Sequence, residues 1–194
     1  ATALLFAGEA LYRPVLDATN QLETIFLRRS AVVFGITVEF LCILAIPMIA
    51  VSLYPVLRRF SETAALAYVV FRVLEAAYFG GVDISKLSLI NLSRQYMART
   101  GEDAASYGVL HDYLSAQHIW SGTTDLIYLL TFIIGTLVLN GLLFRTRLVP
   151  RAIAVTGLIS AALLAIGNYI AILSATPPDY VVWLIVPIAV QEMV

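Results

Sequence analysis

The sequence predicts an all-α fold, a polytopic transmembrane helical bundle in which residues 1–194 form a single integral membrane domain. The composition is the first reason. Of the 194 residues, 60% are hydrophobic and only 13% are charged, about half the share of about 25% in soluble proteins. The second reason is four apolar runs of about 20 residues or more, the length that an α-helix needs to cross a bilayer. With a mean hydropathy of +0.88, the chain carries more apolar side chain than a soluble fold can bury, so lipid is its expected surroundings.

The expected spans follow one another along the whole chain. The four complete spans lie at about 30–54, 63–82, 118–144 and 151–174. Residues 1–7 look like the end of an earlier helix, and the segment from about 180 to 194 looks like a last span that is cut off. We therefore interpret the chain as a fragment of a parent with six spans, of which the first and last are partial here.

Three local patterns refine these elements. Asn20 followed by Glu23 has the spacing of a capping box, in which two side chains satisfy backbone N–H groups at a helix start, so a short helix is expected before the first complete span. Cys42, the single cysteine, lies within an apolar run and is expected to be a packing residue. A row of small residues, which lets a neighbouring helix approach closely, occupies every fourth position of the fourth complete span: Gly157, Ala161 and Ala165.

The distribution of arginine sets the expected orientation. Two short links, 54–62 and 144–151, carry Arg58, Arg59, Arg145, Arg147 and Arg151. Short loops rich in Lys and Arg stay on the cytoplasmic side, so both links are expected to be cytoplasmic. The segment 83–117 is then an extracytoplasmic loop. Its apolar residues repeat near a helical spacing, which predicts an interfacial helix within it.

Polar residues inside the expected spans form the candidate site. Arg72 and Glu75 are three residues apart and therefore share a helix face. At a rise of about 1.5 Å per residue, polar residues of other helices come to similar depths, between the midplane and the outer third of the bilayer. We therefore predict one buried polar cluster, made of Arg72, Glu75, Glu39, Asp125, Asn168 and Glu192.

The charges of this cluster are unbalanced, because one arginine meets four acids. An isolated charge at the bilayer centre costs about 2.5–3.5 kcal/mol or more. The acids that lack a charged partner are therefore expected either to be neutral at pH 7 or to lie in a water-filled cavity. Two interpretations remain open: a paired network that locks the helices together, and a working proton or ion site.

A metal site has less support. His111, His118 and Asp125 are spaced by seven residues, which separates them by about 10.5 Å along a helix, whereas metal–nitrogen bonds are about 2 Å long. We therefore predict no metal, with a mixed site that includes Glu39 or Glu75 as the alternative. The chain has no glycine-rich phosphate loop, HExxH or GxSxG motif. No cofactor is assigned, and the net charge of −1 gives no reason to expect nucleic acid.

Four phrases of the chain together resemble a known family. In order, they are LYPVLRRFSE, YVVFRVLEAAY, RTRLVPRAIAVTGLI and PIAVQEM. The family is one of bacterial integral membrane proteins known as domain of unknown function 4386. The resemblance covers nearly the whole chain and is strongest at Arg58, Arg72, Glu75, Pro150 and Glu192. It implies a six-span helical protein of the bacterial inner membrane without an established activity, so no catalytic residue is carried over.

Three functions are weighed on these observations. The first is a non-catalytic membrane subunit or scaffold, an accessory component of a larger complex whose partners are the lipid bilayer and other membrane subunits. It rests on the packing row of small residues and on the lack of an assembled catalytic motif. The alternative is a small-solute or proton-coupled transporter that uses the buried Arg/Glu/Asp cluster. A third, an intramembrane metal-dependent enzyme, needs three ligands around one point.

Overall fold

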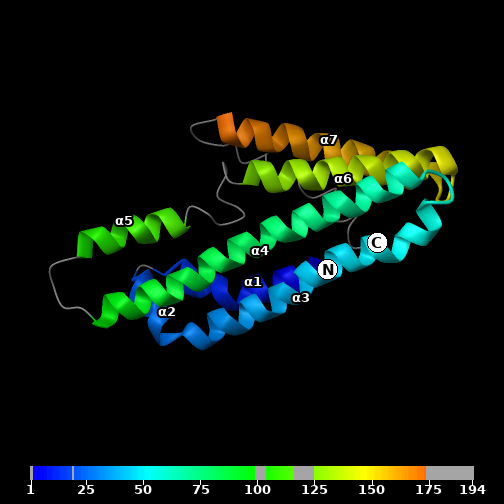
Figure 1. The fold of residues 1–194 in the computed structure, drawn as a ribbon. Helices are drawn as coiled ribbons and strands as arrows, with labels where there is room; N and C mark the ends of the chain where they lie inside the picture. Colours follow the sequence, from blue (N-terminus) through cyan, green and yellow to red (C-terminus); the bar gives the residue numbers. More distant parts are fainter. Residues whose placement is uncertain (1, 19, 99–103, 116–124, 174–194) are drawn as a thin grey trace. The chain divides into compact units, whose positions relative to one another are not determined.

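The computed structural model describes residues 2–18, 20–98, 104–115 and 125–173, and Figure 1 shows that they are almost entirely helical. The helices are α1 (Thr2–Leu16), α2 (Gln21–Leu27), α3 (Arg29–Leu57), α4 (Glu62–Ala98), α5 (Ala104–Ser115), α6 (Asp125–Thr146) and α7 (Arg151–Leu173). These ranges contain no strand. The predicted all-α class is confirmed.

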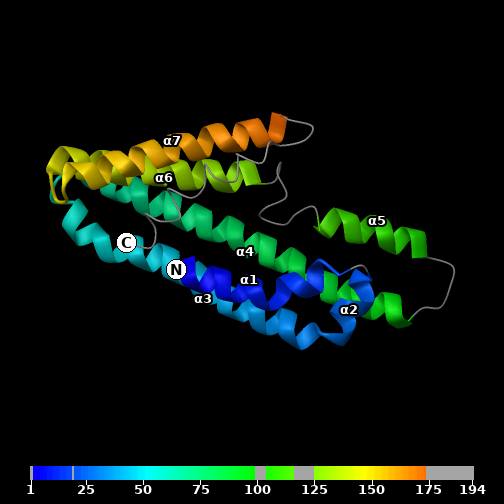
Figure 2. The same ribbon diagram turned by 180° about the vertical axis from the view of Figure 1, so that it is seen from behind.

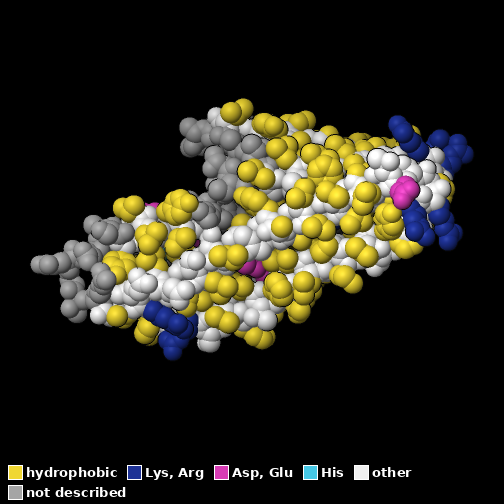
Figure 3. Space-filling model, viewed as in Figure 1, with side chains coloured by type: hydrophobic (Ala, Val, Ile, Leu, Met, Phe, Trp, Pro, Cys, Tyr) yellow, Lys and Arg dark blue, Asp and Glu magenta, His cyan; other side chains and the backbone are white. Residues whose placement is uncertain are grey.

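Within the described residues, four helices are long and apolar enough to cross a membrane: Arg29–Leu57, Glu62–Ala98, Ile127–Thr146 and Arg151–Ile170. Each of them overlaps one of the four predicted spans. Between 33% and 39% of the residues in their apolar windows are buried, so most of them are at least partly exposed, and Figure 3 shows hydrophobic side chains spread over the surface. An outward apolar surface on helices of this length is what a lipid environment requires. The predicted last span, about 180–194, lies outside the described residues.

The helix α4 extends well beyond the boundary predicted at residue 82, since it continues without interruption to Ala98. The expected interfacial helix is therefore the second half of α4 and not a separate element. The buried face of this half repeats at the three- and four-residue spacing of a helix, with Phe79, Val82, Lys86 and Ser93 among its members. At about 1.5 Å per residue, the 37 residues of α4 measure about 55 Å, longer than a hydrocarbon core of about 30 Å.

The chain divides into two compact units, which are described separately. Unit 1 comprises Ala1–Leu44 and Tyr78–Thr124, and unit 2 comprises Ala45–Ala77 and Asp125–Val194. In unit 1, α1 lies along the first part of α3 in both ribbon views (Figures 1 and 2). The apolar core of unit 1 draws on α1 to α5 and contains Tyr12, Val15, Ile25, Val32, Ile36, Leu89, Ile90, Leu92 and Tyr107.

The short helix predicted after Asn20 is present, but its expected capping box is not. Asn20 occupies the N-cap position of α2 without a side-chain capping hydrogen bond. Its backbone carbonyl instead accepts hydrogen bonds from the backbone N–H and the hydroxyl of Thr24, at 2.9 and 2.8 Å. The side chain of Gln21 turns back to donate to the carbonyl of Leu16 at 2.6 Å. The end of α1 and the start of α2 are thus joined by Gln21, and not by the predicted box.

In unit 2, α6 and α7 pack side by side (Figures 1 and 2). Ala161, from the predicted row of small residues, is fully buried within their shared core of Leu129, Phe132, Ile133 and Leu164. Its methyl group lets the two helices approach closely. A second core joins the end of α3, the start of α4 and the end of α6 through Ala50, Leu57, Ala65, Tyr68 and Leu142.

The C-terminal end of α6 is defined by its backbone conformation. Arg147 has a φ of 56°, a left-handed conformation that is common just after a helix end. Its N–H donates to the carbonyl of Leu143 at 3.0 Å, and Pro150 then accepts from the N–H of Ile153 as α7 begins.

Candidate functional site

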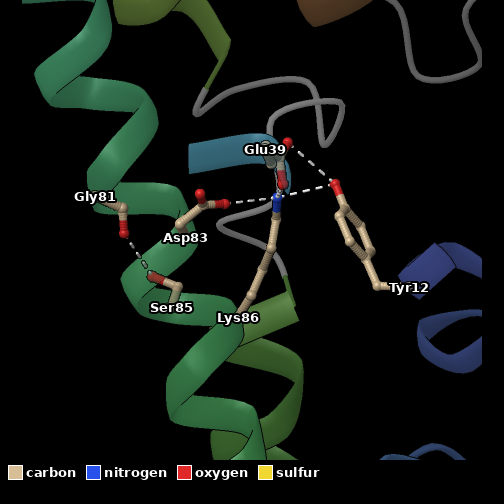
Figure 4. Close-up of polar contacts among 6 residues, drawn as sticks. All are labelled: Tyr12, Glu39, Gly81, Asp83, Ser85 and Lys86. Carbon is tan, nitrogen blue, oxygen red and sulfur yellow. Dashed lines mark hydrogen bonds and ion pairs between the residues drawn. The ribbon is translucent and has the colours of Figure 1, made fainter. Parts of the chain in front are cut away.

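A buried lysine of α4 contacts polar groups of three helices. The Nζ atom of Lys86 donates to the hydroxyl of Tyr12 at 2.9 Å, to Oε2 of Glu39 at 2.6 Å and to Oδ1 of Asp83 at 2.9 Å. Tyr12 in turn donates to Oε1 of Glu39 at 3.3 Å. Figure 4 shows the three acceptors arranged around the ammonium group. We call these four residues the Lys86 network.

The network joins three helices of unit 1. Tyr12 belongs to α1, Glu39 to α3, and Asp83 and Lys86 to α4. The i, i+3 spacing of Asp83 and Lys86 places both on one face of α4. Lys86 also lies over the ring of Tyr12, 4.4 Å from its centroid, so the aromatic face adds a cation–π contact to the hydrogen bond.

A close helix crossing brings α1 to this position. Gly8 of α1 faces Gly35 of α3, and a Cβ atom added to Gly8 would lie 2.7 Å from the carbonyl oxygen of Gly35 and 3.2 Å from Cβ of Glu39. Only glycine allows this approach, which resembles the close contacts of small residues in membrane helices. Because Tyr12 is four residues after Gly8, it lies one turn further along the same face of α1 and reaches Glu39 and Lys86.

All four members of the Lys86 network are withdrawn from the surface, with exposed fractions of 1% for Glu39, 2% for Tyr12, 3% for Lys86 and 5% for Asp83. Charges this deep are stable only when they are paired and hydrogen-bonded. The three N–H donors of the lysine are each used. One acceptor is left over, because Oδ2 of Asp83 is buried and has no hydrogen-bond partner.

Unit 2 contains a second buried ion pair. Nη1 of Arg72 lies 2.8 Å from Oε2 of Glu75, and both side chains are at most 8% exposed. The guanidinium lies over the rings of Tyr68 and Phe132, 5.5 and 5.1 Å from their centroids. Arg72 therefore connects α4 to α6 through an aromatic contact as well as pairing within α4. The predicted sharing of a helix face by Arg72 and Glu75 is confirmed.

The remaining predicted members of the cluster are spread over several elements. Asn168 lies in α7 of unit 2, and its Oδ1 atom is buried without a hydrogen-bond partner. Asp125 is the first residue of α6, but its side chain lies outside the described part. Glu192 also lies outside it. Arg72 thus pairs with Glu75, and Glu39 belongs to the Lys86 network. The association of all six residues in one cluster stays a prediction.

A family comparison covers the entire chain. The family described as a domain of unknown function, DUF4386, matches residues 1–194. The chain belongs to this family. No curated protein and no solved structure matches it. The function of this DUF4386 chain therefore has to be argued from its own geometry.

Lys86 of this DUF4386 chain was not among the residues predicted for the buried cluster, although it adds a second buried cation. The predicted count of one cation against four acids left out Lys86, which lies 2.6 Å from Glu39. Lys86 and Asp83 were assigned to an extracytoplasmic loop, since their charges lower the local hydropathy. Asp83 and Lys86 carry opposite charges three residues apart, and such pairs stabilise a helix. Their spacing could therefore have indicated that the helix continues past residue 82.

The histidine that raised the possibility of a metal site has a different setting. Nδ1 of His111 lies 3.2 Å from Oδ1 of Asp112 in α5. Within the described ranges, no group of three or more His, Cys, Asp or Glu side chains is placed to hold a metal ion. His111 instead borders a cavity of about 380 Å³ in unit 1, lined also by Asn20, Gln21, Leu22, Glu23, Tyr96 and Gly108. His118, the other histidine of the predicted motif, lies outside the described part.

One end of unit 2 is strongly basic. Figure 3 shows Lys and Arg side chains gathered where α3 meets α4 and where α6 meets α7. The exposed arginines of these two links are Arg58, Arg59, Arg145, Arg147 and Arg151. The guanidinium groups of Arg58 and Arg151 lie over the rings of Tyr54 and Phe144, 5.9 and 5.2 Å from the centroids. The two links predicted to share a side of the membrane thus lie at the same end of unit 2.

Proposed function

We propose that this DUF4386 chain is a non-catalytic integral membrane scaffold that serves as an accessory subunit of a larger membrane complex. The observation that carries the proposal is the Lys86 network. Each N–H of one buried ammonium group is used to join α1, α3 and α4. A buried polar network with its donors satisfied makes helix packing rigid and specific, which is the property that a scaffold needs.

The second buried pair supports the same function. Arg72 is held by Glu75 and by the rings of Tyr68 and Phe132. Such a group is costly to expose or to move in lipid. Both buried cations of the described spans therefore act as packing elements that tie helices together.

We further propose that the protein lies in a bacterial inner membrane with the links 54–62 and 144–151 in the cytoplasm. The five exposed arginines at one end of unit 2 favour this orientation, since short basic loops stay on the cytoplasmic side. The length of α4 supports placing the segment 83–117 on the opposite side. If α4 enters from the cytoplasmic side at Glu62, about 20 residues cross the core, and the remainder of the helix extends outward.

The second candidate function is a small-solute or proton-coupled transporter built on Arg72, Glu75, Glu39, Asp125, Asn168 and Glu192. Buried oxygen atoms without hydrogen-bond partners favour it, namely Oδ2 of Asp83, Oγ1 of Thr136 and Oδ1 of Asn168. Such atoms are rare in native proteins and are explained by strain, water or a functional role. Flux through the purified protein separates this candidate from the scaffold.

The experiment reconstitutes the purified protein into liposomes that contain a pH-sensitive dye and imposes a proton gradient. For the scaffold, we expect the same rate of pH equilibration as in empty liposomes, unchanged by Glu75→Gln or Glu39→Gln. A protein-dependent flux that either substitution abolishes would refute the scaffold and establish the transporter. Glu62→Gln, an exposed acid at the start of α4, is the matched control.

The accessory role is tested in the native membrane. Extraction into lipid nanodiscs without detergent, followed by single-particle mass measurement, should yield one defined species heavier than the 21.2 kDa chain with its lipid. The purified protein alone should not reproduce that species. Recovery of only the single chain from native membranes would exclude a stable complex.

A further inference from the structure

The packing of unit 2 brings arginines from two distant parts of the chain to one end. The end of α3, the start of α4 and the end of α6 share one apolar core. Arg58 and Arg59 directly follow α3, and Arg145 lies in the last turn of α6. Arg151, the first residue of α7, lies over the ring of Phe144 of α6, 5.2 Å from its centroid. Figure 3 shows these Lys and Arg side chains at the same end of unit 2.

The charge at this end is not offset by acids. The two links 54–62 and 144–151 contain five arginines and one acid, Glu62, which leaves a net charge of +4. Glu62 belongs to the first turn of α4, where a negative charge also interacts with the helix dipole. The ion pairs among the described residues involve other cations, namely Arg13, Arg72, Lys86 and His111. The described acids therefore leave the five arginines of the two links unneutralised.

Two of the five guanidinium groups are oriented by aromatic rings. Arg58 lies over Tyr54 and Arg151 over Phe144, 5.9 and 5.2 Å from the ring centroids. A stacked guanidinium group uses its flat face and keeps the N–H groups at its edge for other acceptors. Such an edge binds two oxygen atoms of one phosphate group at once. The chemistry of these arginines therefore suits a phosphate ligand.

The position of the arginines favours the phosphate of a lipid over that of a soluble molecule. Each of the five lies within two residues of an end of a membrane-spanning helix, and lipid phosphates lie in the headgroup layer just outside the hydrocarbon core. Exposed apolar side chains directly adjoin these arginines in the sequence: Phe60, Phe144 and Leu148. On a membrane, such side chains enter the acyl boundary while the cations stay among the headgroups. A soluble anion would leave them in water.

We propose that this end of unit 2 is a binding surface for anionic phospholipids, whose phosphate groups are bound by Arg58, Arg59, Arg145, Arg147 and Arg151. Zwitterionic phospholipids also carry a phosphate, but their own cationic group offsets it, so the surface selects headgroups with a net negative charge. The inference does not depend on the scaffold function or on the orientation of the chain, since it concerns whichever leaflet the two links face.

Native mass spectrometry of the detergent-purified protein tests the inference. The protein is mixed with equal amounts of dioleoyl phosphatidylglycerol and dioleoyl phosphatidylcholine, which have the same acyl chains. We expect phosphatidylglycerol to be enriched among the bound lipids. The double variant Arg58→Gln with Arg59→Gln should lower this enrichment by at least about fivefold, the effect of one surface cation on binding to anionic lipid. The matched control is Arg28→Gln with Arg29→Gln, which removes two adjacent exposed arginines of unit 1 and should leave the enrichment unchanged.

Four results would overturn the inference. Equal binding of the two lipids would remove the selectivity, and an equal loss in the control variant would reduce it to a general effect of charge. Loss of the enrichment in inorganic phosphate at constant ionic strength would indicate a site for a soluble anion. Binding of polyglutamate without enrichment of phosphatidylglycerol would indicate a site for an acidic protein segment.

A second variant in the other link keeps the test independent of the folding of the first. If circular dichroism shows that Arg58→Gln with Arg59→Gln is not folded, Arg145→Gln with Arg151→Gln takes its place. The same decrease of at least about fivefold is expected, and an unchanged enrichment in this folded variant would contradict the assignment.

Discussion

Replacement of Lys86 by methionine removes the ammonium group that joins three helices while keeping an unbranched side chain of similar length. Glu39 then loses its contact at 2.6 Å and Asp83 loses its contact at 2.9 Å. Removing one partner of a buried ion pair costs about 3–5 kcal/mol. The acids can reduce this loss by taking up protons, and polar contacts within membranes are often weaker than expected. We therefore expect a loss of about 3 kcal/mol, or about 100-fold in the unfolding equilibrium constant.

The assay is unfolding of the purified protein in mixed micelles with increasing SDS, followed by circular dichroism. Asp17→Asn is the control, because the Arg13–Asp17 contact is exposed on both sides and 3.4 Å long, and such a pair contributes about 1 kcal/mol or less. The double variant Lys86→Met with Glu39→Leu should recover part of the loss, since it also removes the stranded acid. A loss below about 1 kcal/mol for Lys86→Met, within the range of an exposed pair, would refute the reasoning.

Three further predictions concern packing, the α6–α7 link and topology. Gly8→Ala should destabilise the protein by about 1–3 kcal/mol through overpacking, whereas Gly80→Ala, where a Cβ meets open space, should be neutral or stabilising by about 0.5–1 kcal/mol; equal effects in SDS unfolding would contradict the close crossing. Arg147→Gly should be more stable than Arg147→Ala by about 1 kcal/mol, because only glycine adopts a φ of 56° without strain; the reverse order would contradict this. In a Cys42→Ala background, a membrane-impermeant maleimide should label Asp112→Cys but not Arg147→Cys in intact spheroplasts, and the opposite pattern would invert the proposed topology.

Periodic features of the chain were predictable because they depend on neighbours in sequence. The apolar runs identified α3, α4, α6 and α7 as long helices, since hydropathy over about 20 residues reflects the local chain alone. The contact of Arg72 with Glu75 was predictable for the same reason, because residues three apart on a helix are adjacent. The end of α4 was not predictable in this way, since Asp83 and Lys86 lower the local hydropathy although the helix continues to Ala98.

The partner of Glu39 was not predictable from spacing. Glu39 and Lys86 are 47 residues apart, and no periodicity connects a residue of one helix with a residue of another. The same holds for Tyr12, which reaches the network because Gly8 and Gly35 let α1 approach α3 closely. A glycine in an apolar helix does not by itself indicate a close helix crossing. Whether it lies at one depends on the residue that it faces in the neighbouring helix.

The sequence by itself determined that this chain is helical, that four helices have the length and composition of membrane spans, and that arginines gather in two short links. Only the tertiary structure decided which buried charges compensate one another. In it, Lys86 forms ion pairs with Glu39 and Asp83, and Oδ2 of Asp83 has no hydrogen-bond partner. The physical reason is that hydropathy and helix periodicity act along the chain, whereas charge compensation depends on distances between helices that are set by packing.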